Sequence, residues 1–273
     1  MSYRSILVNL DIDGPVTPLI KLAADLARRF DARLIGCSGA DIVPPFVTTE
    51  GMMLDGELIE RQRTDIEARL IHLQNKFTEL AGTGLDIEWR GDLMEPSRLV
   101  IGLARMADLI VTGSPEGAKV GNLHRSMDLG NLLLHAGRPV LLAAASAEHL
   151  LAKNVLVAWK DSREARRAVV DAIPLLSGAS EVVVATVDRG GTRQAKQSIA
   201  DVTVFLGRHG IKARAEVVAE KGDAAVLKNL AGSMHADLIV SGAYGHSRLR
   251  ELVFGGVTRS LLDEIGVNRL MSS

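Results

Sequence analysis

Residues 107–113 read Ala-Asp-Leu-Ile-Val-Thr-Gly, and residues 236–242 read Ala-Asp-Leu-Ile-Val-Ser-Gly, so almost the same heptad returns 129 positions later. A second pair of apolar runs, residues 6–8 and 155–157, lies 149 positions apart. Matching segments at both ends of each half indicate two copies of one structural unit within this chain.

The two copies differ in length. The unequal offsets mean that the first copy carries about twenty more residues, which we place at 41–60, where prolines and glycines interrupt any regular period. Gly137 and Gly266 again lie 129 positions apart, so the register holds to the end of the chain. We therefore predict two similar domains, residues 1–146 and 153–273.

Each copy alternates short apolar runs with helical spacing. Residues 154–159 form a short apolar run typical of a buried strand, and Ser162 is placed to cap a following helix. In the first copy, Ile66, Leu70 and Phe77 are spaced for one face of a long helix. The alternation predicts an α/β fold with two tandem doubly wound open parallel sheets.

We expect the two halves to be separate five-stranded sheets packed about a pseudo-twofold axis. Asn268 and Arg269 stand where the first half has Pro139 and Val140. This polar pair predicts that the last strand of the second half is shorter or poorly packed.

The composition limits the classes of function. Apolar residues make up 47% of the chain, enough to close a core, which excludes disorder over most of its length. The net charge of −1 gives no support to binding of nucleic acid or anionic membranes. Cys37 is the single cysteine, which excludes an intrachain disulfide. Without a signal-like or membrane-spanning apolar run, we expect a cytoplasmic protein.

A glycine-rich stretch follows the second copy of the heptad. Gly242 and Gly245 are followed after nine residues by Gly255 and Gly256, directly before a helix that we predict over 256–265. Glycines let a ligand approach the backbone, and unpaired N–H groups at a helix start suit a phosphate. Those groups belong to Gly256, Val257 and Thr258. The same glycines would equally serve two strand-to-helix turns that bind nothing, and the stretch is not a Walker loop.

With this loop, both halves resemble universal stress protein domains, and the whole chain resembles a tandem member of that family. The nucleotide-binding branch carries Gly-x2-Gly-x9-Gly after the fourth strand, and Gly242, Gly245 and Gly255 match it. The resemblance implies an adenine nucleotide, ATP with or without magnesium, and an adenine nucleotide alpha hydrolase-like fold. The implied nucleotide-binding residues are Gly242, Tyr244, Gly245, His246, Gly255, Gly256, Val257, Thr258, Val187 and Asp161.

The second half departs from the family pattern at two positions. Gly256 stands where the family has Ser or Thr, which removes a hydroxyl but keeps the backbone donor. The family's nucleoside-contacting Asp aligns with Lys160, and Asp161 follows one place later as a substitute. Val187 falls where the family packs a residue against adenine.

The first half shows the reverse pattern. Asp11 fits the family's nucleoside-contacting Asp, but the loop is degraded. Pro115 removes a backbone donor and Glu116 would repel a phosphate. Ser126 and Met127 replace Gly255 and Gly256. We expect this half not to bind ATP in the family manner.

These observations favour a stress-response or signalling protein that binds an adenine nucleotide in its second half. One alternative is a slow ATPase using the same pocket, although the sequence offers no evident catalytic residue or metal ligand. A second alternative is a protein-interaction or small-molecule carrier module without any nucleotide. We expect a pseudo-dimer within one chain, with further homodimerisation left open.

Overall fold

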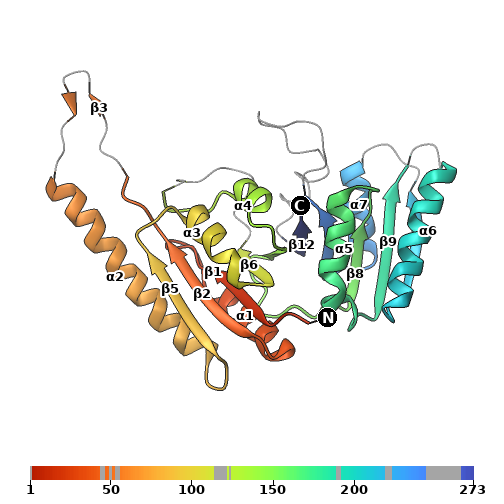
Figure 1. Ribbon diagram of the computed structural model, residues 1–273, viewed down its shortest axis with the longest axis horizontal. Coiled ribbons are helices and arrows are strands. Elements are labelled where there is room, and N and C mark those ends of the chain that lie inside the picture. The colour runs from red at the N-terminus through yellow and green to blue at the C-terminus, as the bar shows by residue number, and fades with distance from the viewer. Residues whose placement is uncertain are drawn as a thin grey trace.

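The computed structural model shows a long, twisted sheet with helices on both of its faces (Figure 1). It describes residues 2–43, 47–48, 51–52, 56–113, 122, 124–188, 192–218, 223–243 and 266–273. No helix among these residues has both the length and the apolar character required to span a bilayer.

Among the residues that the structure describes, the first half contains five strands of the main sheet and four α-helices in alternation. In chain order they are β1 (Ser5–Asn9), α1 (Thr17–Phe30), β2 (Arg33–Gly39), α2 (Gly56–Ala81), β5 (Ile87–Asp92), α3 (Pro96–Leu103), β6 (Leu109–Gly113), α4 (Leu129–His135) and β7 (Val140–Ala143). A short hairpin of β3 (Val47–Thr48) and β4 (Gly51–Met52) precedes α2, and a 3-10 turn, η1 (Ala104–Met106), follows α3.

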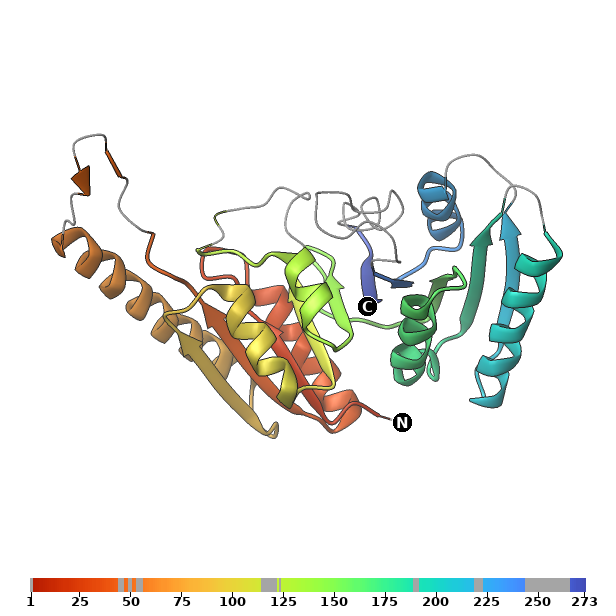
Figure 2. The same ribbon diagram turned by 45° about the horizontal axis from the view of Figure 1, so that its top comes forward.

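The second half repeats this order without the hairpin. Its described elements are β8 (Asn154–Ala158), α5 (Arg163–Leu176), β9 (Glu181–Val187), α6 (Arg193–Arg208), β10 (Ala213–Val218), α7 (Asp223–Ser233), β11 (Leu238–Gly242) and β12 (Asn268–Ser272). The helix predicted over 256–265 lies outside the described residues. The extra residues of the first half include β3, β4 and the start of α2, which lie together at one end of the molecule (Figure 2).

The strand order confirms a doubly wound arrangement in each half. The sheet runs β10-β9-β8-β11-β12-β7-β6-β1-β2-β5. The central strand β8 of the second half lies between β9 and β11, and the central strand β1 of the first half lies between the equivalent strands β2 and β6. Within each half, all pairs of the main sheet are parallel. The order reverses between β1 and β6 and between β8 and β11, and these are the places where ligands bind in such sheets.

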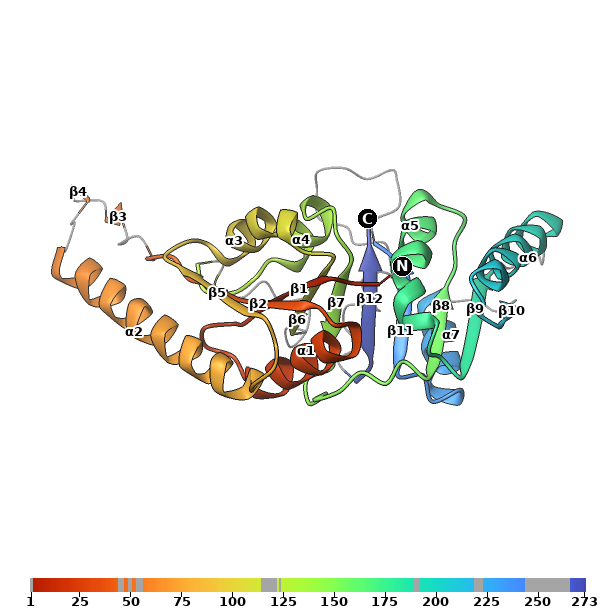
Figure 3. The ribbon, with the colours of Figure 1, turned by 60° about the horizontal axis from the view of Figure 1, so that its bottom comes forward.

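The prediction of two separate sheets is wrong, because β12 pairs antiparallel with β7 and makes one ten-stranded sheet (Figure 3). Leu141 is opposite Leu270, and these two residues lie 129 positions apart, the offset of the repeat. A local twofold axis therefore passes through this pair. The pairing satisfies the backbone N–H and C=O groups that two separate sheets would leave exposed at their edges.

The prediction of a short or poorly packed last strand is also wrong. Strand β12 has five residues and all of them are buried. The Asn268 side chain accepts a hydrogen bond from the Ala144 N–H at 3.0 Å and donates one to the Asp237 carbonyl at 3.1 Å. Because its polar atoms are paired with backbone groups, Asn268 can be buried at the junction at little cost.

One apolar core runs through both halves on the face covered by α1, α2, α5 and α6. The strand pattern explains why, since alternate residues such as Ile6 and Val8 face this core while Leu7 faces the core under α3 and α4. Leu141 and Leu270 belong to the shared core. Across the halves, the Tyr3 hydroxyl donates to the Asp171 carbonyl at 2.5 Å.

The shared core predicts that the chain unfolds as one unit. We expect Leu141→Ala and Leu270→Ala each to lower the free energy of unfolding by about 2–5 kcal/mol, because both side chains are fully buried. Leu134→Ala, at a residue that is 52% exposed, is the control and should change it by less than about 0.5 kcal/mol. Urea unfolding followed by circular dichroism measures all three. Two resolved transitions, each moved by only one of the core variants, would contradict the prediction.

Candidate functional site

Three of the predicted nucleotide-binding residues lie at the carboxyl ends of adjacent strands. Val187 ends β9, Gly242 ends β11, and Asp161 follows β8, which lies between them. The register places Ala158 opposite both Ala185 and Ser241, so these strand ends are level with one another. Seven other predicted residues lie outside the described residues: Tyr244, Gly245, His246, Gly255, Gly256, Val257 and Thr258.

Gly242 lies against the first turn of α5. A Cβ atom at Gly242 would lie 2.6 Å from the Ala165 nitrogen and 2.8 Å from the Glu164 carbonyl carbon. These are backbone atoms that cannot move aside, so only glycine fits at the end of β11. The packing of β11 on α5 therefore explains this glycine without a ligand.

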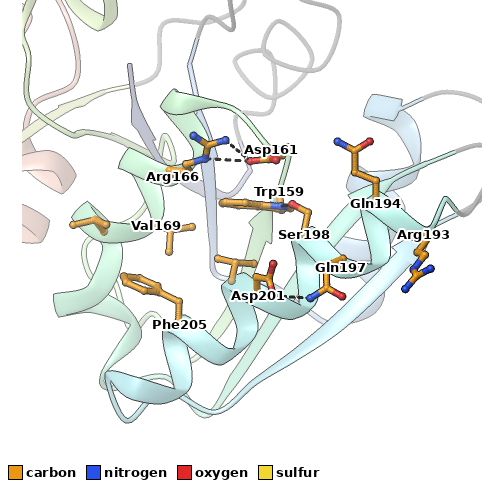
Figure 4. Close-up of a pocket in the computed structure, with 12 residues that line it drawn as sticks. Trp159, Asp161, Arg166, Val169, Arg193, Gln194, Gln197, Ser198, Asp201 and Phe205 are labelled. Atoms are coloured by element: carbon orange, nitrogen blue, oxygen red, sulfur yellow. Dashed lines mark hydrogen bonds and ion pairs between the residues drawn. The ribbon is translucent and has the colours of Figure 1, made fainter.

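Asp161 is held by an arginine one turn into α5. Its Oδ1 accepts hydrogen bonds from Arg166 Nε at 3.1 Å and from Nη2 at 2.6 Å, as Figure 4 shows. The Ser162 N–H donates to the Lys160 carbonyl at 2.7 Å, and Ser162 Oγ accepts from the Ala165 N–H as the predicted helix cap. Asp161 is therefore fixed in place, with one carboxylate oxygen engaged by the guanidinium group.

The turn after β9 is closed by an aspartate that the sequence interpretation missed. The Asp188 carboxylate accepts hydrogen bonds from the Thr192 N–H at 2.6 Å and from its hydroxyl at 2.8 Å. Thr192 in turn caps α6 by accepting from the Ala195 N–H at 3.2 Å. The Asp-x3-Thr spacing before a helix was the available signal.

Glu164 is the second residue missed. Its sequence position, in the first turn of α5, is typical of an exposed acid that interacts with the helix dipole. In the structure the residue is only 1% exposed and lies beside Gly242. Burial of this carboxylate depends on how β11 packs against α5, which local sequence does not reveal.

In the first half, ion pairs link side chains near the carboxyl ends of the strands, the edge that corresponds to the predicted site of the second half. Asp13, in the loop after β1, accepts hydrogen bonds from Arg125 Nε at 2.7 Å and from Arg69 Nη1 at 2.6 Å. Asp65 on α2 also pairs with Arg69, at 3.0 Å. The Asp41 N–H donates to the His124 carbonyl at 2.6 Å. The loops after β1 and β2 are therefore tied to the segment that precedes α4.

Two aspartates at this edge have pKa values shifted in opposite directions. Burial raises the pKa of Asp11, although its side chain accepts a hydrogen bond from the Asp13 N–H at 2.9 Å. The hydrogen bond from Arg125 lowers the pKa of Asp13. Asp11 is the residue that the resemblance assigns to nucleoside contact.

Among the described residues, no group of three or more His, Cys, Asp or Glu side chains is arranged to hold a metal ion.

No model of a protein family matches the chain. By sequence, the chain is similar to Universal stress protein Slr1230 from Synechocystis sp. (strain ATCC 27184 / PCC 6803 / Kazusa), with 25% identity over 167 residues. The match covers 59% of this chain and 56% of the relative, so the chain spans about half the length of the curated relative it matches.

By structure, the chain is similar to a universal stress protein from Archaeoglobus fulgidus DSM 4304, with a TM-score of 0.74 and 17% identity over 98% of this chain and 96% of that one. A shorter match, a universal stress protein in complex with cAMP, has a TM-score of 0.35 and 21% identity over 52% of this chain and 97% of that chain. The cAMP is a ligand of that protein. The resemblance to universal stress proteins is confirmed, and the chain has their fold.

The two aspartates predict opposite responses to neutralisation. At pH 7 we expect Asp11→Asn to raise the midpoint of urea unfolding, because it removes a charge that burial disfavours. The gain in stability should vanish below the ordinary Asp pKa of about 4, where Asp11 is neutral in both the folded and the unfolded state.

Asp13→Asn should lower stability at pH 7 by up to about 1 kcal/mol, because it removes two exposed ion pairs. That loss should fade as the pH falls through the lowered pKa of Asp13. A loss of stability at pH 7 in Asp11→Asn would contradict the conclusion that burial disfavours the charge of Asp11.

Proposed function

We propose that this chain is a universal stress-type protein of the stress-response or signalling class that binds an adenine nucleotide, ATP, in its second half. The observation that carries the proposal is the position of Asp161 and Gly242, which lie on either side of the point where strand order reverses between β8 and β11. Open α/β sheets bind ligands at this point, beyond the carboxyl ends of the strands.

The sequence supports backbone recognition of the phosphates. A phosphate requires several N–H donors within about 3 Å, and a loop with glycines at 245, 255 and 256 lets the main chain supply them without side-chain obstruction. The proposed partners of the phosphates are the N–H groups of Gly245, His246, Gly256, Val257 and Thr258, with Tyr244 beside them.

Asp161 and Val187 form the nucleoside side of the proposed site. Arg166 engages Oδ1 of Asp161, so Oδ2 is the oxygen proposed to accept a hydrogen bond from a ribose hydroxyl. The guanidinium group also offsets the carboxylate charge, which reduces its repulsion of the phosphates. Val187 is half-buried at the end of β9, where it offers an apolar contact for the base.

The ion pairs of the first half support one nucleotide site per chain. Binding at the edge of β1 would require a ligand to separate Asp13 from Arg125 and Arg69. The corresponding interaction in the second half is a single Asp161–Arg166 pair within one helical turn and its preceding loop.

We further propose that residues 1–146 and 153–273 are two domains, joined through β7 and β12, and that the protein is cytoplasmic. The antiparallel pair supports the pseudo-dimer expected from the repeat, because each half covers the sheet edge of the other.

Valine substitutions in the two loops test the proposal. We expect Gly245→Val or Gly255→Val to abolish ATP binding, because a branched side chain obstructs the approach of the phosphate to the backbone. Gly117→Val is the matched control in the first half, and it should leave the affinity within a few-fold. Isothermal titration calorimetry with ATP, run on each variant after a check of its circular dichroism, measures affinity and stoichiometry.

The expected stoichiometry is one ATP per chain. Two equivalent sites, or loss of binding through Gly117→Val alone, would show that the site lies in the other half. Phosphate release from ATP by the wild type above the level of Gly245→Val would show hydrolysis in the same pocket. No binding of ATP, ADP or AMP by the wild type would overturn the proposal in favour of a module that binds no nucleotide.

A further inference from the structure

A groove lies between α5 and α6 on the outer face of the second half, below the edge at which the nucleotide is proposed to bind (Figure 4). Its volume is about 890 Å³, within the range of small-molecule sites, which is about 300–1,000 Å³. The Trp159 indole, which follows β8, lies at its centre, and its N–H donates to Ser198 Oγ at 2.9 Å.

The groove changes in polarity along its length. On α6 the lining residues follow one helical stripe that begins with Arg193 and Gln197, passes Asp201 and ends with Val202 and Phe205. On α5 the same order appears, from Arg166 to Val169 and Val170. Arginines therefore lie at one end of the groove and apolar side chains at the other.

The equivalent helices of the first half are packed differently, although the fold is the same. There α1 and α2 pack against each other, whereas α5 and α6 barely touch. The buried face of α2 fills the space with Leu70, Leu73 and Phe77, along a helix of 26 residues. Helix α6 has 16 residues and buries only Ile199, Val202 and Leu206. In the second half, the Val170 residue on the apolar wall of the groove is consequently 38% exposed.

Of the four charged side chains that line the groove, Arg193 and Asp201 have no oppositely charged partner among the described residues. Asp161 pairs with Arg166 at 2.6 Å, and Gln197 donates to the Asp201 carboxylate at 2.8 Å. Arg193, at the polar end of α6, has no acidic partner in the part of the chain that the structure describes. An anionic group placed there would meet a guanidinium group that none of the described side chains engages.

We propose that this groove is a binding site for a small amphipathic anion. The apolar part of this ligand, an acyl chain or a ring, lies on Val170, Val202 and Phe205. Its anionic group, a carboxylate or a phosphate, points to Arg193. The stripe from Arg193 to Phe205 spans about 18 Å along α6, which accommodates a medium-length acyl chain. The groove shares Asp161 with the proposed nucleotide site, but the inference does not rest on nucleotide binding, since the ligand contacts the walls formed by α5 and α6 rather than the loop after β11.

Trp159 makes binding measurable with dodecanoate as the probe. The chain has two tryptophans, and Trp89 packs on Phe77 in the other half, so Trp89→Phe leaves Trp159 as the only reporter. In this background and without nucleotide, we expect dodecanoate below its micellar concentration to change the emission of Trp159 saturably.

Two valines provide the matched pair of variants. Val170→Asp, in the groove, should weaken dodecanoate binding by at least about tenfold, because it places a charge against the acyl chain. Val204→Asp, on α6 but outside the groove and 60% exposed, should leave the affinity within about twofold. Both positions are exposed, so both variants should fold, and circular dichroism verifies this.

The headgroup is tested separately with dodecanol. Arg193→Gln should weaken dodecanoate about two- to fivefold and leave dodecanol unchanged. Equal weakening of the two probes, or no effect on either, would overturn the anion assignment. The absence of a saturable response to dodecanoate would overturn the site itself, as would equal losses in Val170→Asp and Val204→Asp. A carboxylate and a phosphate ester are distinguished by repeating the titration with dodecyl phosphate.

Discussion

The antiparallel pairing of β7 with β12 is the interaction on which the rest of the structure depends. Each half ends its sheet at one of these strands, and an unpaired edge would expose a row of backbone donors and acceptors. Because Leu141 and Leu270 are equivalent in the repeat and lie opposite each other, each half supplies the same surface to the junction. The pairing keeps α1, α2, α5 and α6 on one face and joins their cores into one.

Although the two halves share one fold, they differ in the polar side chains that follow the carboxyl ends of their strands. In the first, Asp13 connects Arg69 on α2 with Arg125, so that side chains far apart in sequence close the edge. In the second, Asp161 interacts with Arg166 in the neighbouring turn. The difference follows from where arginines occur, rather than from any difference in strand order.

The sequence predicted much of this fold because the signals involved are local. Buried strands read as short apolar runs, Ser162 was identified as a helix cap, and the stripe of Ile66, Leu70 and Phe77 identified α2. The junction could not be predicted in the same way, since any strand edge carries the same backbone groups. Asn268 was misinterpreted because its burial depends on the Ala144 N–H, which lies 124 residues away. The groove was missed because Arg193 and Gln197 have the pattern of a solvated helix face, and only the distance between α5 and α6 reveals it.

Helix α5 connects the proposed nucleotide site with the groove. Its first turn packs on Gly242 so closely that no Cβ fits there, which fixes the position of the helix relative to β11. Arg166, one turn on, holds Asp161 at the edge of the sheet and also lines the polar end of the groove. Val169 and Val170, in the next turn, form the apolar wall. A close-packed helix moves as a unit rather than bending at each contact. The glycine required at the end of β11 therefore fixes the helix that holds Asp161 through Arg166 and that forms one wall of the groove.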